Sequence, residues 1–215
     1  MLDDIFLLSY FIVLVGSYIA TYIQRDILTK ADKWISYLLV LTIFFEACSK
    51  IASNAYHNNM FVYHIWSPIQ LFMFCLYFNQ RVRLLRKYSL GLIVGTLGIL
   101  IAIFNAVFFQ PLLTINSIFL LYEGFSIMAL CLVAFYELVY YEEDIINNVH
   151  FWLSTIFLIY WSSVYVYWGM YYYLITSMIA YIKPITYSIW TVNILAYAAI
   201  AIVFLRYNKM LRANG

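Results

Sequence analysis

The chain has 215 residues, of which 66% are hydrophobic and only 10% are charged, and its formal net charge is +2. A soluble domain carries about a quarter charged residues, so this composition excludes an ordinary water-soluble globular domain. The basic residues are dispersed over several short loops, which also excludes a polybasic nucleic-acid-binding surface.

Seven apolar segments follow one another along the chain. Each is long enough, or nearly so, to cross a hydrocarbon core of about 30 Å as a helix. Helices are expected because unpaired backbone groups are costly in lipid, and the alternating pattern of a β-barrel is not seen. The predicted spans are Asp4–Ile23, Trp34–Ser53, Phe61–Phe78, Tyr88–Phe109, Leu113–Tyr141, Val149–Tyr172 and Pro184–Phe204. The sequence therefore predicts an all-α integral membrane protein, a seven-transmembrane-helix bundle that forms a single domain over residues 1–215.

The basic residues predict how this bundle is oriented. Ten of the twelve occur in three segments that seven crossings place on one side: Arg25, Lys30, Lys33, Arg81, Arg83, Arg86, Lys87, Arg206, Lys209 and Arg212. Only Lys50 and Lys183 lie near the other side. Since Lys and Arg are retained in the cytoplasm, we expect the N-terminus outside and the C-terminus in the cytoplasm. The loop after the fifth span carries Glu142, Glu143 and Asp144, but acidic residues contribute little to orientation.

Polar residues inside the second and third spans are the first candidates for a site. Glu46 and Lys50 are four residues apart and share one face of the second span, where they form an intrahelical ion pair or face a polar cavity. In the third span His64, Ser67 and Gln70 follow one another at intervals of three along one side. His64 lies near the outer end, so a plain interfacial position is its alternative.

In the fourth span Gly91, Gly95 and Gly98 form a stripe of small residues. Such a stripe is suited to close packing between helices. It predicts internal architecture or, alternatively, a face through which a second copy or another protein partner assembles.

The fifth span contains the most suggestive residue, Glu123, which has no basic residue three or four positions away. An uncompensated carboxylate in a bilayer is expensive, so we expect it to be protonated, hydrogen-bonded across helices or in contact with water. A polar contact between helices without a substrate is the alternative. Trp161 in the sixth span and Asn193 in the seventh lie at a similar depth.

These depths suggest a polar cavity in the outer half of the bundle that opens away from the cytoplasm. The candidate residues for binding a small molecule or an ion are Glu46, Lys50, His64, Gln70, Glu123, Trp161 and Asn193. The favoured function is that of a transporter- or channel-like protein. The alternatives are a ligand-sensing receptor that signals through a separate cytoplasmic partner, and a membrane-embedded interaction subunit without a substrate of its own.

Several activities are excluded by missing motifs. The last span has Lys183 only at its mouth, whereas retinal attachment needs a deep lysine. Neither His-Glu-x-x-His nor Gly-x-Ser-x-Gly occurs, so we expect no enzyme. Cys48, Cys75 and Cys131 lie singly in apolar runs, which predicts buried small side chains and neither a metal site nor a bound cofactor.

The stretch Tyr63-His64-Ile65-Trp66-Ser67-Pro68-Ile69-Gln70, followed by apolar residues, resembles a segment of small uncharacterised multi-pass membrane proteins of Bacteroidota-type bacteria. The resemblance covers under a tenth of the chain and implies no activity. It implies a multi-pass protein of the bacterial inner membrane.

Overall fold

A computed structural model describes residues 2–141 and 144–213. This part of the chain is all-helical, with 87% helix and no strand. Seven of its helices are long and apolar enough to cross a membrane, so the chain is a multi-pass membrane protein and the predicted fold class is confirmed at this level. Glu142 and Glu143 of the acidic loop lie outside the described residues.

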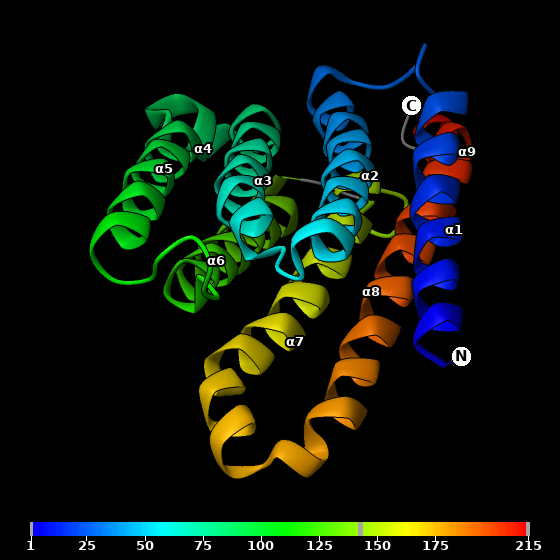
Figure 1. The fold of residues 1–215 in the computed structure, drawn as a ribbon. Helices are drawn as coiled ribbons and strands as arrows, with labels where there is room; N and C mark the ends of the chain where they lie inside the picture. The colour runs from blue at the N-terminus through cyan, green and yellow to red at the C-terminus, as the bar shows by residue number, and fades with distance from the viewer. Residues whose placement is uncertain (1, 142–143, 214–215) are drawn as a thin grey trace. The chain divides into compact units, whose positions relative to one another are not determined.

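The seven long helices are accompanied by three short elements (Figure 1). In chain order the helices are α1 (Leu2–Ile23), α2 (Lys30–Tyr56), α3 (Met60–Arg81), α4 (Arg83–Tyr88), α5 (Leu90–Phe108), α6 (Ser117–Tyr141), α7 (Val149–Ser177), the 3-10 helix η1 (Ile179–Tyr181), α8 (Ile182–Leu205) and α9 (Tyr207–Ala213). The elements α4, η1 and α9 are too short to span a bilayer. The sequence interpretation did not anticipate them.

The predicted starts of the fourth and fifth spans lie before the observed ones. The fourth span starts at Leu90, and not at Tyr88, because Ser89 adopts a left-handed conformation with φ 53° that separates α4 from α5. The fifth span starts at Ser117, and not at Leu113. There Gln110 Oε1 accepts a hydrogen bond from Ile118 N at 3.1 Å, and Gln110 Nε2 donates to Ser117 Oγ at 2.9 Å. A distant side chain therefore caps α6 and defines its first turn.

The chain forms two compact units, which are described separately. Unit 1 comprises Met1–Leu28 and Cys131–Gly215, and unit 2 comprises Thr29–Leu130. The boundary runs through α6, whose first half belongs to unit 2. The prediction of a single domain over residues 1–215 stays a prediction.

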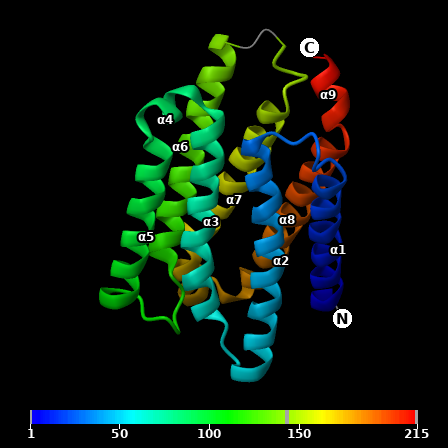
Figure 2. The same ribbon diagram turned by 90° about the horizontal axis from the view of Figure 1, so that it is seen from above.

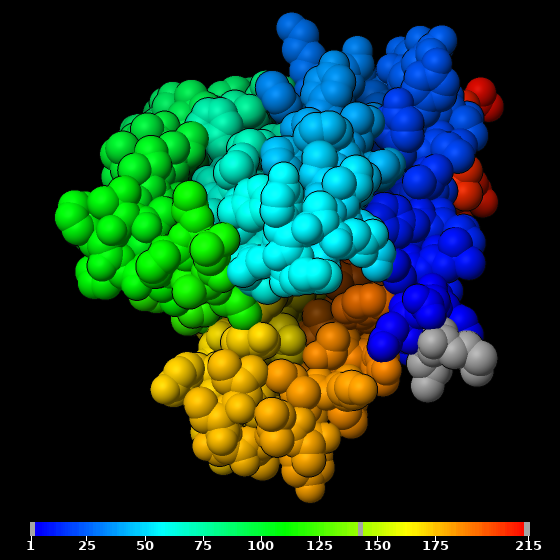
Figure 3. Space-filling model, in the orientation of Figure 1, coloured from blue at the N-terminus to red at the C-terminus, as the bar shows by residue number. Residues whose placement is uncertain are grey.

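In unit 1, α8 packs against both α1 and α7. Ser17 Oγ of α1 donates to the Tyr197 carbonyl oxygen of α8 at 2.6 Å, and Tyr187 OH donates to Asp3 Oδ1 at 2.7 Å. The rings of Phe6 and Tyr187 stack with their centroids 5.1 Å apart. The helices α7 and α8 meet through η1, and their side chains adjoin at the yellow and orange end of the space-filling view (Figure 3).

In unit 2, α3 lies between α2 and α5 (Figures 1 and 2). The three glycines of α5 are buried against α3. At Gly91 the two backbones come so close that an added Cβ would lie 2.6 Å from the Cys75 carbonyl oxygen, and Gly91 N donates to Asn79 Oδ1 at 3.2 Å. The prediction of close helix packing is confirmed within the chain. Assembly with a second copy stays a prediction.

The face of α5 opposite its glycines carries large apolar side chains. Leu100, Ile103 and Val107 are 58–67% exposed, although none has a polar atom in its side chain. Exposed aliphatic side chains on one face and small buried residues on the other are what a helix needs between lipid and protein.

Candidate functional site

Glu46 belongs to a polar cluster that joins α2 to the start of α3. Its carboxylate hydrogen-bonds with the hydroxyl of Tyr63, which also accepts from Ser49 Oγ at 3.2 Å. Asn59 Nδ2 donates to Ser49 Oγ at 2.7 Å. We call Glu46, Ser49, Asn59 and Tyr63 the α2–α3 polar cluster. Tyr63 and Asn59 were not among the predicted site residues, and Lys50 lies one turn beyond Glu46 with an exposed side chain.

His64 holds the loop between α5 and α6. Its side chain is buried, with 8% exposure, and its Nε2 lies 2.9 Å from the Thr114 carbonyl oxygen. Because a carbonyl oxygen only accepts, Nε2 is the donor. Asn58 Nδ2 donates to the Leu113 carbonyl oxygen of the same loop at 3.0 Å. This arrangement supports a positioning role for His64.

The same loop folds around Gln110, which the sequence interpretation missed. Asn105, only 2% exposed at the end of α5, donates from Nδ2 to Gln110 Oε1 at 3.1 Å. The capping bonds of Gln110 to α6 complete the network. Gln70 of α3 is half-buried and lies outside this network. A single glutamine thus ties the end of α5 to the start of α6.

Glu123 is the buried carboxyl of unit 2. Its side chain is fully buried, at 0% exposure, and neither carboxyl oxygen has a hydrogen-bond partner among the residues that the structure describes. It lies in the neighbourhood of Cys75 of α3. The adjacent Tyr122 donates from its hydroxyl to the Val94 carbonyl oxygen at 3.2 Å, and its ring lies beside Gly98. These neighbours locate Glu123 near the middle of α3 and α5.

Glu46 and Glu123 do not lie side by side. Their neighbours on α3, Tyr63 and Cys75, are twelve residues apart, which is about 18 Å along an α-helix. Unit 2 therefore has a hydrogen-bonded carboxylate near the start of α3 and a separate, isolated carboxyl deeper along it.

The two remaining predicted site residues belong to unit 1. Trp161 of α7 is 2% exposed, and Asn193 of α8 is half-buried. Their convergence with Glu123 on one cavity stays a prediction. On the same stretch of α7, Ser154 is completely buried, and its hydroxyl has no hydrogen-bond partner in the described part of the chain. In the sequence, the only indication that Ser154 belongs to a site is its position four residues after His150.

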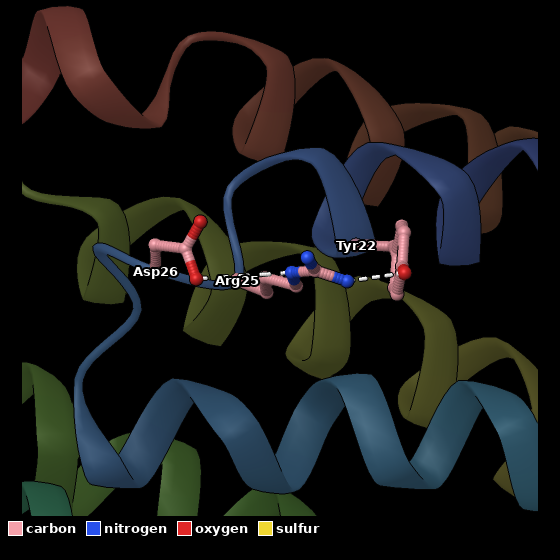
Figure 4. Close-up of polar contacts among 3 residues, drawn as sticks. All are labelled: Tyr22, Arg25 and Asp26. Atoms are coloured by element: carbon pink, nitrogen blue, oxygen red, sulfur yellow. Dashed lines mark hydrogen bonds and ion pairs between the residues drawn. The ribbon is translucent and has the colours of Figure 1, made fainter.

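The loop after α1 carries one of the basic residues that predicted the orientation. Arg25 Nη1 donates to the hydroxyl of Tyr22, and Arg25 Nε lies 3.7 Å from Asp26 Oδ1 (Figure 4). The guanidinium also lies 4.5 Å from the centre of the Tyr22 ring. Both charged side chains are more than half exposed, so this pair adds little to stability. The charge of Arg25 is partly balanced by its neighbour.

Groups of three or more His, Cys, Asp or Glu side chains that could hold a metal ion do not occur among residues 2–141 and 144–213. The candidate site thus consists of an isolated carboxyl group and a separate polar cluster near the start of α3. Comparison of the chain with family models, with curated proteins and with solved structures gives no match.

Proposed function

We propose that this protein is a transporter- or channel-like protein of the bacterial inner membrane that handles a proton or another small cation through Glu123. The observation that carries the proposal is that Glu123 is fully buried within a membrane-spanning helix, with both carboxyl oxygens lacking a hydrogen-bond partner among the described residues. Leaving such a group buried costs about 1–3 kcal/mol. Ionisable residues inside a membrane commonly mark ion or proton pathways.

The chemical class of the species follows from the surrounding charges. No Lys or Arg occurs between Lys87 and Lys183, so α6 and its flanking loops offer Glu123 no fixed cation. A proton or a bound cation would neutralise the carboxyl group, whereas an anionic substrate would be repelled. A cation is therefore favoured over the other small molecules that the sequence allows.

The α2–α3 polar cluster is our proposed point of entry. In the predicted orientation Glu46 and its hydroxyl and amide neighbours lie at the outer end of α2 and α3. An acidic group there raises the local concentration of cations before they move inward along α3 toward Glu123. His64, which holds the adjacent loop, would shape this entry without binding the ion.

The predicted orientation has a direct test. In a variant with Cys48, Cys75 and Cys131 replaced by alanine, single cysteines are introduced as Leu112→Cys and Leu84→Cys, at positions that are 51% and 43% exposed. We expect a membrane-impermeant maleimide to label position 112 in intact spheroplasts, and position 84 only after lysis. Labelling of position 84 in intact spheroplasts, and of position 112 only after lysis, would show that the orientation is the opposite one.

The proposed activity predicts that purified protein in liposomes dissipates an imposed pH or Na⁺ gradient. We expect Glu123→Gln to reduce this flux at least tenfold, because a neutral amide cannot exchange a proton or attract a cation. The flux is followed with a pH-sensitive or Na⁺-sensitive dye enclosed in the liposomes.

Glu137→Gln is the matched control for this experiment. Glu137 is half-buried on the same helix, and its replacement should leave the flux within about twofold of the wild-type value. The proposal fails if wild-type protein carries neither ion, or if Glu123→Gln retains full flux.

A further inference from the structure

The carboxyl group of Glu123 is bordered by apolar side chains and a thiol. One turn before it and one turn after it on α6, Phe119 and Ile127 are both completely buried. Cys75 of α3 lies in its neighbourhood. Gly95 of α5 comes so close to this part of α3 that an added Cβ would lie 3.2 Å from Cys75 Cβ, and it brings no side chain of its own. The surroundings of the carboxyl group are therefore poor in oxygen.

The hydroxyl groups nearest to Glu123 in the sequence are directed elsewhere. Tyr122 OH donates to the Val94 carbonyl oxygen at 3.2 Å, and the hydroxyl of Ser126 lies beside that of Tyr122. Neither hydroxyl bonds to Glu123, since both of its carboxyl oxygens lack a hydrogen-bond partner among the described residues. These hydroxyl groups therefore do not join the carboxyl group in a ligand set.

The backbone around Glu123 is regularly helical in the described part of the chain. Transporters commonly bind Na⁺ with the carbonyl oxygens of helices that are unwound at the site. In α5 and α6, which are continuous helices, the carbonyl oxygens accept helical hydrogen bonds instead. In α3, Pro68 deprives the His64 carbonyl oxygen of its helical N–H donor. His64 precedes Cys75 by eleven residues, however, which places this oxygen about 16 Å away along the helix.

We propose, on the basis of the function proposed above, that Glu123 binds a proton and that its buried side chain is a neutral carboxylic acid. Hard cations such as Mg²⁺ and Ca²⁺ take about six or more oxygen ligands. One thiol and one carboxyl group are also too few for a softer ion such as Zn²⁺, which takes about four ligands. A proton needs a single carboxyl oxygen, and the neutral acid is the form that an apolar site favours.

Release of this proton requires water. The described residues offer the acid no hydrogen-bond partner, and the titratable side chains near it, Cys75 and Tyr122, keep their own protons at neutral pH. The helix α5 carries no titratable side chain. When a water molecule enters, the O–H bond of the acid breaks, its electron pair stays on the carboxylate and the proton passes to the water as hydronium. Uptake is the reverse step.

Infrared spectroscopy of the full-length protein at neutral pH tests the charge state directly. A protonated carboxyl group has a C=O stretching band that an ionised carboxylate lacks. We expect this band in the wild-type chain, its shift to lower frequency when glutamate is labelled with a heavy carbon isotope, and its loss in E123Q. In the matched control E137Q, which changes a half-buried carboxyl group of the same helix, the band should persist.

A second variant leaves Glu123 untouched. The chain has five glutamates, and E46Q/E137Q/E142Q/E143Q retains only Glu123. The band should persist in this variant because Glu123 is its source. Absence of the band from this variant or from the wild-type chain would overturn the proposal, whether or not E123Q folds.

Metal salts separate the proton from other cations. Molar NaCl, KCl or LiCl should leave the band of the wild-type chain unchanged, whereas a metal ion that binds the carboxylate would displace the proton and remove the band. Removal by salt, or liposome flux of Na⁺ without flux of protons, overturns the assignment of the proton and leaves the proposed function standing. A salt-insensitive band without flux of either ion supports the neutral acid and overturns the proposed function.

Discussion

Replacing Glu123 with methionine is expected to raise the free energy of unfolding by about 1–3 kcal/mol, although it abolishes the proposed cation flux. Glu123 is completely buried, and neither of its carboxyl oxygens has a hydrogen-bond partner among the described residues. Methionine has a similar length and flexible torsions, so it fills the same space without polar atoms to desolvate. Gain of stability with loss of activity is typical of a functional group that is held in an unfavourable environment.

The matched substitution is Glu46→Met, for which we expect the opposite sign. Glu46 is hydrogen-bonded with the Tyr63 hydroxyl, so its removal should lower the free energy of unfolding by about 1 kcal/mol. Both variants are measured by reversible unfolding in mixed micelles of a mild detergent and dodecyl sulfate. A loss of more than about 1 kcal/mol for Glu123→Met would identify an essential structural contact and remove the main support for the proposed function.

The long helices could be predicted because the bilayer imposes a simple requirement on each of them. About 20 consecutive apolar residues are needed to cross the hydrocarbon core, and this requirement can be read from local composition. The ends of the helices depend on more distant contacts. The start of α6 is defined by Gln110, seven residues before Ser117, and no local capping pattern indicates such a residue. A prediction from hydropathy alone therefore started the fifth span too early, at Leu113.

The candidate site, like the helices, could be predicted only in part. The sequence showed that Glu123 has no basic residue three or four positions away on its own helix, but it could not show that its carboxyl oxygens lack a hydrogen-bond partner among the described residues. The hydrogen-bond partner of Glu46 could not be predicted either. Tyr63 lies on the next helix and is one of 22 tyrosines, most of which fit equally well as interfacial or packing residues. Only the close packing of α2 on α3 selects this one hydroxyl.

Glycine 91 is expected to be the most sensitive packing position of unit 2. Gly91→Ala would bring a Cβ within 2.6 Å of the Cys75 carbonyl oxygen and 2.7 Å of Asn79 Cβ. The carbonyl oxygen belongs to the helix backbone and cannot move aside, so α3 and α5 must separate. We expect the free energy of unfolding to fall by about 1–3 kcal/mol, measured in the same mixed micelles.

Two other glycines provide a graded control for this prediction. At Gly98 an added Cβ would meet Leu71 Cδ2 at 2.6 Å, the far end of a flexible side chain, so Gly98→Ala should cost less than Gly91→Ala. At Gly16 of α1 nothing lies within 4 Å, and Gly16→Ala should stabilise the chain by up to about 1 kcal/mol through helix propensity. Equal effects at all three positions would mean that propensity, and not the close contact between α3 and α5, governs stability. The expected order separates the two causes because propensity favours alanine at each position, whereas only Gly91 meets a rigid backbone atom.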